Sequence, residues 1–280
     1  MNQVKYYIEK VLNNNSIVVK TSNKDSKIIL GKGIGYKKKP YTYTIIDNNT
    51  IEKSFFNYDE TLKNQLIDII SYIDENIVEV SNDIIALAEN EFGKLNQHIY
   101  VSLTDHISFA LDRLKTGQII TNPFQSSIKA LLKKEYEIAK KAKDIIYNKL
   151  NIIIPEEEIG FIAFHINAAR ENIKVNFVVL EMRIYKEIIR MIEEYTNKEI
   201  NSDLKADLYY IIQSIIQNQS IPLKFLIRNF NSNNQNLNSN CQKLINDMVW
   251  YIEKNIDSKL KDDQKNILLS YILFVTRNED

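Results

Sequence analysis

The spacing of apolar residues changes near Asp59, and this change constrains the fold more than any other feature of the chain. Before it, short runs rich in Val, Ile and Tyr alternate with turn-forming clusters, as they do in small antiparallel sheets. The runs are YYIEKVL, SIVVKT, KIILG, YTYTII and IEKSFF. After it, stretches such as VLEMRIYKEIIRMIEEY repeat apolar residues at helical spacing, with Lys and Glu between them. The sequence therefore predicts a small antiparallel β-sheet followed by an all-α array.

The helical part is long enough to form two bundles of similar size, because the polar stretch from Arg170 to Lys174 interrupts the apolar pattern near its middle. The expected chain is multidomain, with a sheet domain at residues 1–58, a first helical bundle at 59–171 and a second at 172–280. A single larger helical domain is the alternative, since helical periodicity does not distinguish the two arrangements. Pro155 followed by three glutamates predicts a helix start, and the asparagine-rich residues 229–240 predict a polar loop.

Charge is divided unevenly along a chain whose formal net charge is zero. Residues 1–58 contain ten lysines and four acidic side chains, so this segment carries +6 and the remainder −6. A basic segment with Tyr and Phe between its lysines suits phosphate backbones and offers faces on which unpaired bases stack. Nucleic acid is therefore the expected partner of the sheet domain.

Composition argues against several other classes of protein. No apolar run approaches the roughly 18–20 residues of a membrane span, and the N-terminus lacks the apolar block of a signal peptide. The single Cys241 permits no internal disulfide and leaves a cysteine-based metal site without partners, which fits a reducing compartment. We expect a cytoplasmic protein with no membrane partner, no metal and no cofactor.

Two motifs in the sheet region combine amides, glycines and lysines. KVLNNNSIVVK places three asparagines in an expected strand turn, and GKGIGYKKK, about twenty residues later, combines three glycines with four lysines and a tyrosine. Taken alone, NNN is more often a solvated hairpin turn than a binding site. The occurrence of both motifs within one basic segment favours binding.

These motifs resemble the co-antiterminator RNA-binding domain of the BglG/SacY family of transcriptional antiterminators. The family pattern of Lys, Val or Leu, Asn-Asn-Asn and, later, Gly-Arg-Gly, two residues and Phe is similar to KVLNNN and GKGIGY. Lys32 stands in place of the usual Arg and lacks its planar fork, whereas Tyr36 keeps the stacking face of the usual Phe. The resemblance implies that the RNA-binding residues are Lys10, Asn13, Asn14, Asn15, Gly31, Lys32 and Tyr36.

The resemblance extends into the first helical bundle, where four segments look like the signature of a phosphotransferase-system regulation domain. They are SLTDHISFALDRLKTG, NPFQSSIK, KEYEIAKKA and PEEEIGFIAFHINAA. In such domains two histidines accept phosphate from the sugar phosphotransferase system, and the matching positions here are His106 and His165. The remaining histidine, His98, matches no phosphoacceptor position and is expected to be structural.

The residues around His106 also suggest a phosphate site on local grounds. Ser102 and Asp105 have the spacing of a capping box, which predicts that His106 lies in the first turn of a helix, where free N–H groups and the helix dipole favour an anion. Arg113 follows two turns later and is expected on the same face, as a neighbour of the phosphate. Arg170 is expected to be a solvated or paired surface charge.

The second helical bundle departs from the family, because all three histidines lie before residue 166. The resemblance implies two further phosphoacceptors there, but the chain has LKADLYYII around Asp207 and NILLSYILFVTR around Tyr271. Neither segment offers an imidazole. The second regulation domain is therefore expected to be degenerate.

The sequence thus predicts a transcriptional antiterminator that is not an enzyme. By resemblance, a homodimer binds a hairpin in nascent messenger RNA and prevents an overlapping terminator from forming. Histidine phosphorylation by a sugar-specific enzyme II, with the phosphocarrier HPr as a second candidate donor, controls it. A DNA-binding activator with similar regulation domains is the alternative, but it needs a helix-turn-helix where strands are predicted. A phosphocarrier or other enzyme needs a catalytic pocket, and the sequence has no Gly-rich phosphate loop, HExxH motif or nucleophile–base pair.

Overall fold

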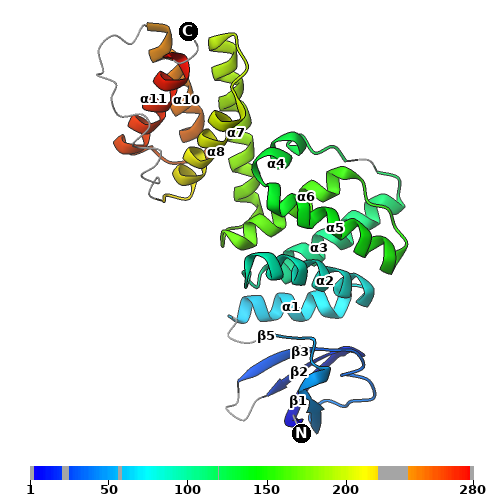
Figure 1. Ribbon diagram of the computed structural model, residues 1–280. Coiled ribbons are helices and arrows are strands. Elements are labelled where there is room, and N and C mark those ends of the chain that lie inside the picture. The colour runs from blue at the N-terminus through cyan, green and yellow to red at the C-terminus, as the bar shows by residue number, and fades with distance from the viewer. Residues whose placement is uncertain (1–2, 21–24, 56–58, 119, 220–238, 278–280) are drawn as a thin grey trace. The chain divides into compact units, whose positions relative to one another are not determined.

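The computed structural model of the chain describes residues 3–20, 25–55, 59–118, 120–219 and 239–277 (Figure 1). Packing divides the chain into two compact units. The first consists of residues 1–120 and 138–159, and the second of residues 121–137 and 160–280. The β-sheet and the first three helices belong to the first unit.

The expected antiparallel sheet begins the first unit. Its strands follow the predicted runs: β1 (Gln3–Asn13), β2 (Ser16–Lys20), β3 (Ser26–Leu30), β4 (Tyr43–Asp47) and β5 (Lys53–Phe55). Neighbouring strands are antiparallel, and their spatial order is β4-β1-β2-β3-β5. The small antiparallel sheet predicted from the alternating runs is confirmed.

An apolar cluster forms on one side of the sheet, because alternate residues of a strand point in the same direction. Its buried members are Tyr6, Ile8, Ile17, Val19, Ile29, Ile34 and Ile46. Strand β4 lies at one edge of the described sheet, next to β1, and its Tyr43 and Ile45 are 68% and 63% exposed. This edge therefore presents apolar and aromatic side chains to solvent.

Three helices follow the sheet: α1 (Glu60–Tyr72), α2 (Glu75–Phe92) and α3 (Ile99–Lys115). The apolar spacing stays helical through residues 61–77, but this stretch forms two helices, and α1 ends before Ile73. Asp74 starts α2, because it caps that helix by accepting a hydrogen bond from the N–H of Asn76 at 2.9 Å. Helix α1 packs against β1 and α3, and α2 packs against α3 (Figure 1). The sheet and the first helices are thus in direct contact.

The middle of the chain contains α4 (Gln125–Leu131), α5 (Lys133–Leu150) and α6 (Glu156–Arg170). The helix start predicted at Pro155 is confirmed, since α6 begins with three glutamates in its first turn, where the helix dipole favours negative charge. At the other end of α6, Arg170 forms ion pairs with Glu171 and with the buried Glu135 of α5. Arg170 is therefore a paired charge.

Four further described helices belong to the second unit: α7 (Val175–Thr196), α8 (Ser202–Ile216), α10 (Ser239–Ile256) and α11 (Asp262–Arg277). Helices α7 and α11 each pack against α8 and α10. The loop predicted at residues 229–240 lies outside the described residues up to 238, and its last two residues begin α10. The division of the helices into two domains at 171/172 stays a prediction. None of the helices that the structure describes is long and apolar enough to cross a membrane.

Candidate nucleic-acid interface and histidine site

Hydrogen bonds connect the asparagine turn (residues 13–15) with the glycine loop (residues 31–37) at one end of the β1–β2 hairpin. The N–H of Gly31 donates to the backbone oxygen of Asn15 at 2.9 Å, and that of Gly35 donates to the backbone oxygen of Asn14 at 2.8 Å. The N–H of Gly33 donates to the side-chain Oδ1 of Asn15 at 2.5 Å. The two sequence motifs therefore form one connected surface.

Glycine is required at two positions of the glycine loop because the backbone of other segments comes close. A Cβ on Gly31 would lie 2.1 Å from the backbone oxygen of Thr50, and one on Gly35 would lie 2.2 Å from that of Asn13. Gly33 meets no such obstacle, but its φ of 71° is one that residues with a side chain rarely adopt. Gly31 and Gly35 thus allow the loop to lie against its neighbours.

Asn13 uses its side-chain amide within the protein. Its Oδ1 accepts hydrogen bonds from the N–H of Asn15 at 2.9 Å and from the hydroxyl of Ser16 at 2.5 Å. Its Nδ2 donates to the backbone oxygen of Ile70 in α1 at 3.1 Å. Asn13 therefore shapes the asparagine turn and ties it to the first helix.

The seven predicted RNA-binding residues divide into two groups by exposure. The exposed ones are Lys10, Asn14, Lys32 and Tyr36. The others are the half-buried Asn13 and Asn15 and the buried Gly31. Tyr36 is 57% exposed, and the Nζ of Lys37 lies 5.1 Å from the centre of its ring. The first group is placed to contact a ligand, whereas the second shapes the surface that presents it.

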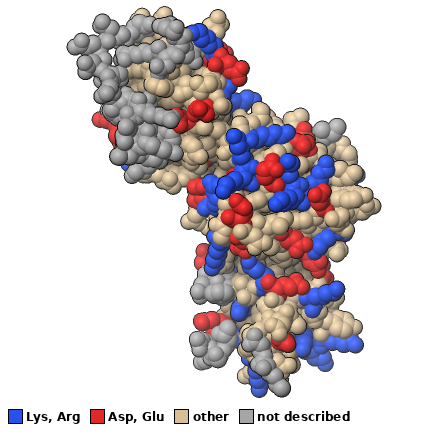
Figure 2. All heavy atoms as spheres, in the orientation of Figure 1, with Lys and Arg blue, Asp and Glu red and all other residues tan. Residues whose placement is uncertain are grey.

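Further exposed aromatic residues with basic neighbours lie in the same domain and were missed by the motif-based prediction. Tyr41 is 77% exposed, and the ring of Tyr43 lies 5.2 Å from that of Tyr7 and 4.6 Å from the Nζ of Lys5. Figure 2 shows basic side chains over the sheet, with acidic ones among them. The alternation in YTYTII was the available sequence signal, because it predicts that Tyr41 and Tyr43 share a face.

His106 lies in the middle of α3 and not in its first turn, so the capping-box prediction was wrong. Helix α3 begins at Ile99, directly after a turn in which Asn96 Oδ1 accepts a hydrogen bond from the N–H of His98 at 2.8 Å. Ser102 is already inside the helix, because its own N–H donates to the backbone oxygen of His98 at 2.9 Å. The free N–H groups of the helix start are therefore not adjacent to His106.

Glu158, in the first turn of α6, connects His106 with Arg113. Its Oε2 lies 3.2 Å from His106 Nε2, and its Oε1 accepts a hydrogen bond from Arg113 Nη2 at 2.9 Å. The side chains of His106 and Arg113 are 15% exposed, and that of Glu158 is 3% exposed. Burial acts to raise the pKa of Glu158, but the contacts with His106 and Arg113 outweigh it and hold that pKa below its usual range. Glu158 is thus a buried carboxylate, and no sequence pattern indicated its contacts with His106 and Arg113.

The other two histidines are placed differently. His165 is half-buried on α6, two turns after Glu158, and it belongs to the second unit, whereas His106 belongs to the first. His98 is exposed and makes no side-chain capping bond to α3. Of the residues predicted for the histidine site, His106 and Arg113 are therefore connected, because both contact Glu158.

The segments without histidine in the second helical region are well-formed helices. Asp207 is half-buried on α8. Tyr271 is buried on α11, and its hydroxyl donates to the backbone oxygen of Leu204 in α8 at 2.8 Å. Tyr271 therefore contributes to the packing of these two helices.

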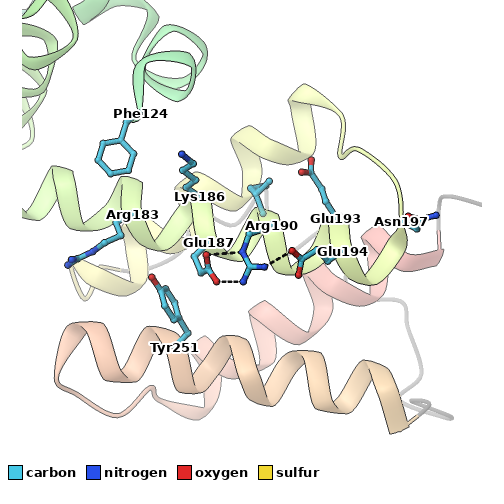
Figure 3. A pocket seen from close by; sticks show the side chains of 10 residues that line it. Phe124, Arg183, Lys186, Glu187, Arg190, Glu193, Glu194, Asn197 and Tyr251 are labelled. Atoms are coloured by element: carbon cyan, nitrogen blue, oxygen red, sulfur yellow. Dashed lines mark hydrogen bonds and ion pairs between the residues drawn. The ribbon is translucent and has the colours of Figure 1, made fainter. Parts of the chain in front are cut away.

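A groove of about 640 Å³ lies along α7, and Phe124 and Tyr251 line it together with charged side chains of that helix (Figure 3). The guanidinium of Arg190 lies in it, held by Glu187 and Glu194 at 2.5 Å each. Within the described part of the chain, none of the predicted site residues lines this groove. Because ion pairs on α7 itself satisfy these charges, we assign no ligand to it.

Two models of known protein families match the chain. The model of the CAT RNA binding domain matches residues 6–64, and that of the PRD domain matches residues 82–169. The first range contains the asparagine turn and the glycine loop, and the second contains His106, Arg113, Glu158 and His165.

Individual proteins are similar over most of the chain. The beta-glucoside operon antiterminator of Dickeya chrysanthemi is 34% identical over 195 residues, which cover 69% of this chain and 68% of that protein. Protein GlcT of Staphylococcus aureus (strain JH9) is 36% identical over 189 residues, which cover 67% of this chain and 66% of GlcT. The matched part thus spans about two thirds of each relative. The crystal structure of GlcT CAT-PRDI has a TM-score of 0.54 and 38% identity, over 59% of this chain and 98% of that one.

Proposed function

The chain belongs to the BglG/SacY family of RNA-binding transcriptional antiterminators, and from this premise we propose that residues 1–58 bind a hairpin in nascent messenger RNA. The bonding of the asparagine turn to the glycine loop carries the proposal, because it brings Asn14, Lys32 and Tyr36 to one end of a domain with a charge of +6. Stabilising the hairpin keeps an overlapping terminator from forming, so that transcription continues. The protein acts in the cytoplasm, where messenger RNA is made in bacteria.

Each exposed residue offers a distinct contact to RNA. Tyr36 presents a ring on which an unpaired base stacks, and Lys32 presents a charge that suits a phosphate. The amide of Asn14 both donates and accepts hydrogen bonds, which suits the edge of a base. Partly unpaired RNA presents all three targets together, whereas paired DNA keeps its bases stacked.

Fluorescence anisotropy of a labelled hairpin RNA mixed with the full chain tests this proposal. Tyr36→Ala should weaken binding roughly 10- to 100-fold, since the stacking of one base contributes about 1–3 kcal/mol. Lys32→Ala should weaken binding and reduce its salt dependence by about one phosphate contact. The matched control is Lys143→Ala, which removes an exposed lysine of α5 and should leave the affinity unchanged. Wild-type affinity in both loop variants, or equal binding of matched duplex DNA, contradicts the proposal.

We further propose that His106 and His165 are phosphoacceptors in a first regulation domain at residues 59–171, followed by a degenerate one at 172–280. An imidazole has an unprotonated nitrogen near neutral pH, and this nitrogen attacks phosphorus. A bond from nitrogen to phosphorus forms while the bond from phosphorus to the donor protein breaks. The donor is a protein of the sugar phosphotransferase system, either an enzyme II specific for one sugar or HPr.

Phosphorylation of the first regulation domain carries the off signal in this proposal. Each phosphoryl group adds about two negative charges at neutral pH. At the interface of a homodimer, such charges oppose association through repulsion and through the cost of removing them from water. The phosphorylated protein is then mostly monomeric and does not hold the RNA hairpin, which keeps the operon silent while its sugar is absent.

A further inference from the structure

The last helices of the chain repeat the burial pattern of earlier ones. Each buried position of α10 matches a buried position of α5 that lies 106 residues earlier, and α5 buries Tyr136 in addition. The pairs are Glu135 with Cys241, Ile138 with Leu244, Ala139 with Ile245, Ala142 with Met248 and Ile146 with Ile252. The same shift relates α6 to α11. The buried pairs there include Ile162 with Leu268 and Ile166 with Ile272.

Helices α2 and α3 are repeated in the same way by α7 and α8. Each buried position of α2 recurs in α7, 104 residues later. The pairs are Ile77 with Glu181, Val78 with Met182, Val80 with Ile184, Ser81 with Tyr185, Ile84 with Ile188, Ile85 with Ile189 and Ala88 with Ile192. Between α3 and α8 the shift is 101, and it pairs Ile107 with Leu208, Ala110 with Ile211 and Leu111 with Ile212. The helical region therefore contains a first copy, α2-α3-α5-α6, and a second copy, α7-α8-α10-α11.

This repeat identifies the counterparts of the histidine cluster. The pairs are His106 with Asp207, Arg113 with Ser214, Glu158 with Gln264 and His165 with Tyr271. The second copy thus has a carboxyl side chain at the position of His106. It has a neutral amide of nearly the same shape at the position of Glu158, and no guanidinium at the position of Arg113. Relative to the first copy, the second has a carboxyl group in place of the imidazole and an amide in place of the carboxyl group.

A negative charge on His106 conflicts with Glu158 in the first copy. Glu158 Oε2 lies 3.2 Å from His106 Nε2, and the glutamate side chain is almost fully buried. Like charges so close together repel strongly when little water screens them. Among the described residues, Arg113 is the one permanent cation paired with Glu158. The first copy therefore accommodates an ionised Glu158 or an anion on His106, but not both.

We propose that Glu158 is the residue that detects a negative charge at position 106. When a phosphoryl group is on His106, Arg113 exchanges the carboxylate of Glu158 for the phosphoryl oxygens, which a guanidinium binds through two parallel hydrogen bonds. Glu158 then moves away from α3, and the first turn of α6, to which it belongs, is displaced as well. This inference rests on the proposed phosphorylation of His106 and identifies the residues that convert it into a change of shape.

The second copy avoids the repulsion between two neighbouring negative charges that Glu158 and an anion on His106 cause in the first copy. Asp207 places a carboxyl group at the histidine position, and the neutral amide of Gln264 is not repelled by an anion. Gln264 also keeps its place at the start of α11, because its Oε1 accepts a hydrogen bond from the N–H of Lys261 at 2.9 Å. The second copy is consequently fixed in a state compatible with the charge and does not respond to phosphate.

Charge variants of the full chain test the inference without a phosphate donor. His106→Asp places a carboxylate beside Glu158, and His106→Asn is the neutral control of the same shape. Hydrogen–deuterium exchange of peptides covering residues 156–166 should be at least about tenfold faster in His106→Asp than in His106→Asn. Adding Glu158→Gln to His106→Asp should restore the slow rate. Equal rates in the two single variants overturn the inference, as does fast exchange that Glu158→Gln does not reverse.

The proposed function has a separate readout. Mass spectrometry after incubation with a phosphorylated donor protein detects phosphate on His106 whether or not α6 moves. Absence of phosphate on His106, together with the expected exchange in the charge variants, contradicts the proposed phosphoacceptor and supports the role of Glu158. Phosphate on His106, together with equal exchange in His106→Asp and His106→Asn, supports the phosphoacceptor and overturns the role of Glu158.

Discussion

Glu181 is a carboxyl group enclosed in the core of the second unit, and it should make this unit less stable as the pH rises. It is 0% exposed on α7. Its Oε1 accepts a hydrogen bond from Gln217 Nε2 at 2.9 Å, and its Oε2 accepts one from the hydroxyl of Tyr209 at 3.4 Å. Burial raises the pKa of Glu181 to about 7, because these hydrogen bonds offset only part of the cost of enclosing a charge, and the nearby charge of Glu171 adds to the rise.

The raised pKa determines the direction of the effect and its pH window. Between pH 4.5, the ordinary pKa, and about pH 7, the folded chain holds a proton on Glu181 that the unfolded chain has released. The free energy of unfolding therefore falls as the pH rises through this window and levels off above about pH 7. At about 1.4 kcal/mol for each pKa unit, the full loss is about 3 kcal/mol.

Glu181→Gln keeps the shape of the side chain and stays neutral, so it should remove this loss. We expect the free energy of unfolding of the variant to lie within about 1 kcal/mol of wild type at pH 5 and to exceed it by about 3 kcal/mol at pH 8. The control is Glu194→Gln, on the exposed side of the same helix. It breaks one surface ion pair and should change the free energy of unfolding by less than about 1 kcal/mol at both pH values.

Trp250 supplies a signal from the same unit. It is the single tryptophan of the chain, and its helix, α10, packs against α7. Urea unfolding followed by the fluorescence anisotropy of Trp250 at pH 5 and pH 8 therefore measures the stability of the region around Glu181. A difference between wild type and Glu181→Gln that is the same at both pH values would show that Glu181 does not titrate in this window, and the reasoning from burial would be wrong.

Three further predictions concern the asparagine turn, the glycine loop and the histidine site. Asn13→Ala removes the amide that ties the turn to α1 and should cost about 1–3 kcal/mol in thermal unfolding, so a loss below about 0.3 kcal/mol would count against its structural role. Gly35→Ala should abolish hairpin binding, because its Cβ would meet the backbone of Asn13, whereas Gly33→Ala should keep hairpin binding and lose about 1 kcal/mol of stability. Equal RNA affinities of the two variants would contradict this prediction. In a terminator-reporter assay, His106→Ala should give antitermination without inducer and His106→Asp should stay inactive and sediment as a monomer. Wild-type behaviour of both variants would identify His106 as a structural histidine.

Several elements follow from local rules that act within a few residues. Alternating apolar residues and turn clusters predicted the strands of the sheet, because side-chain alternation and turn chemistry depend on near neighbours. The glutamates after Pro155 predicted the start of α6 for the same reason. The boundary of α3 shows the limit of such rules. Ser102 and Asp105 have the spacing of a capping box, yet the turn at Asn96 starts the helix earlier and places His106 at its centre.

The sequence by itself determined the order of the elements, the basic character of the sheet and the motifs that identify the family, whereas only the tertiary structure decided which side chains meet. Glu158 contacts His106 and Arg113 because the start of α6 lies beside α3, and no spacing within either helix indicates this. Glu181 stands at a helical position that Ile77 fills in the first copy, and only its enclosure by α8 shows that it is buried. Burial and neighbouring cations set the charge of a carboxyl group, and both depend on segments far apart in the chain.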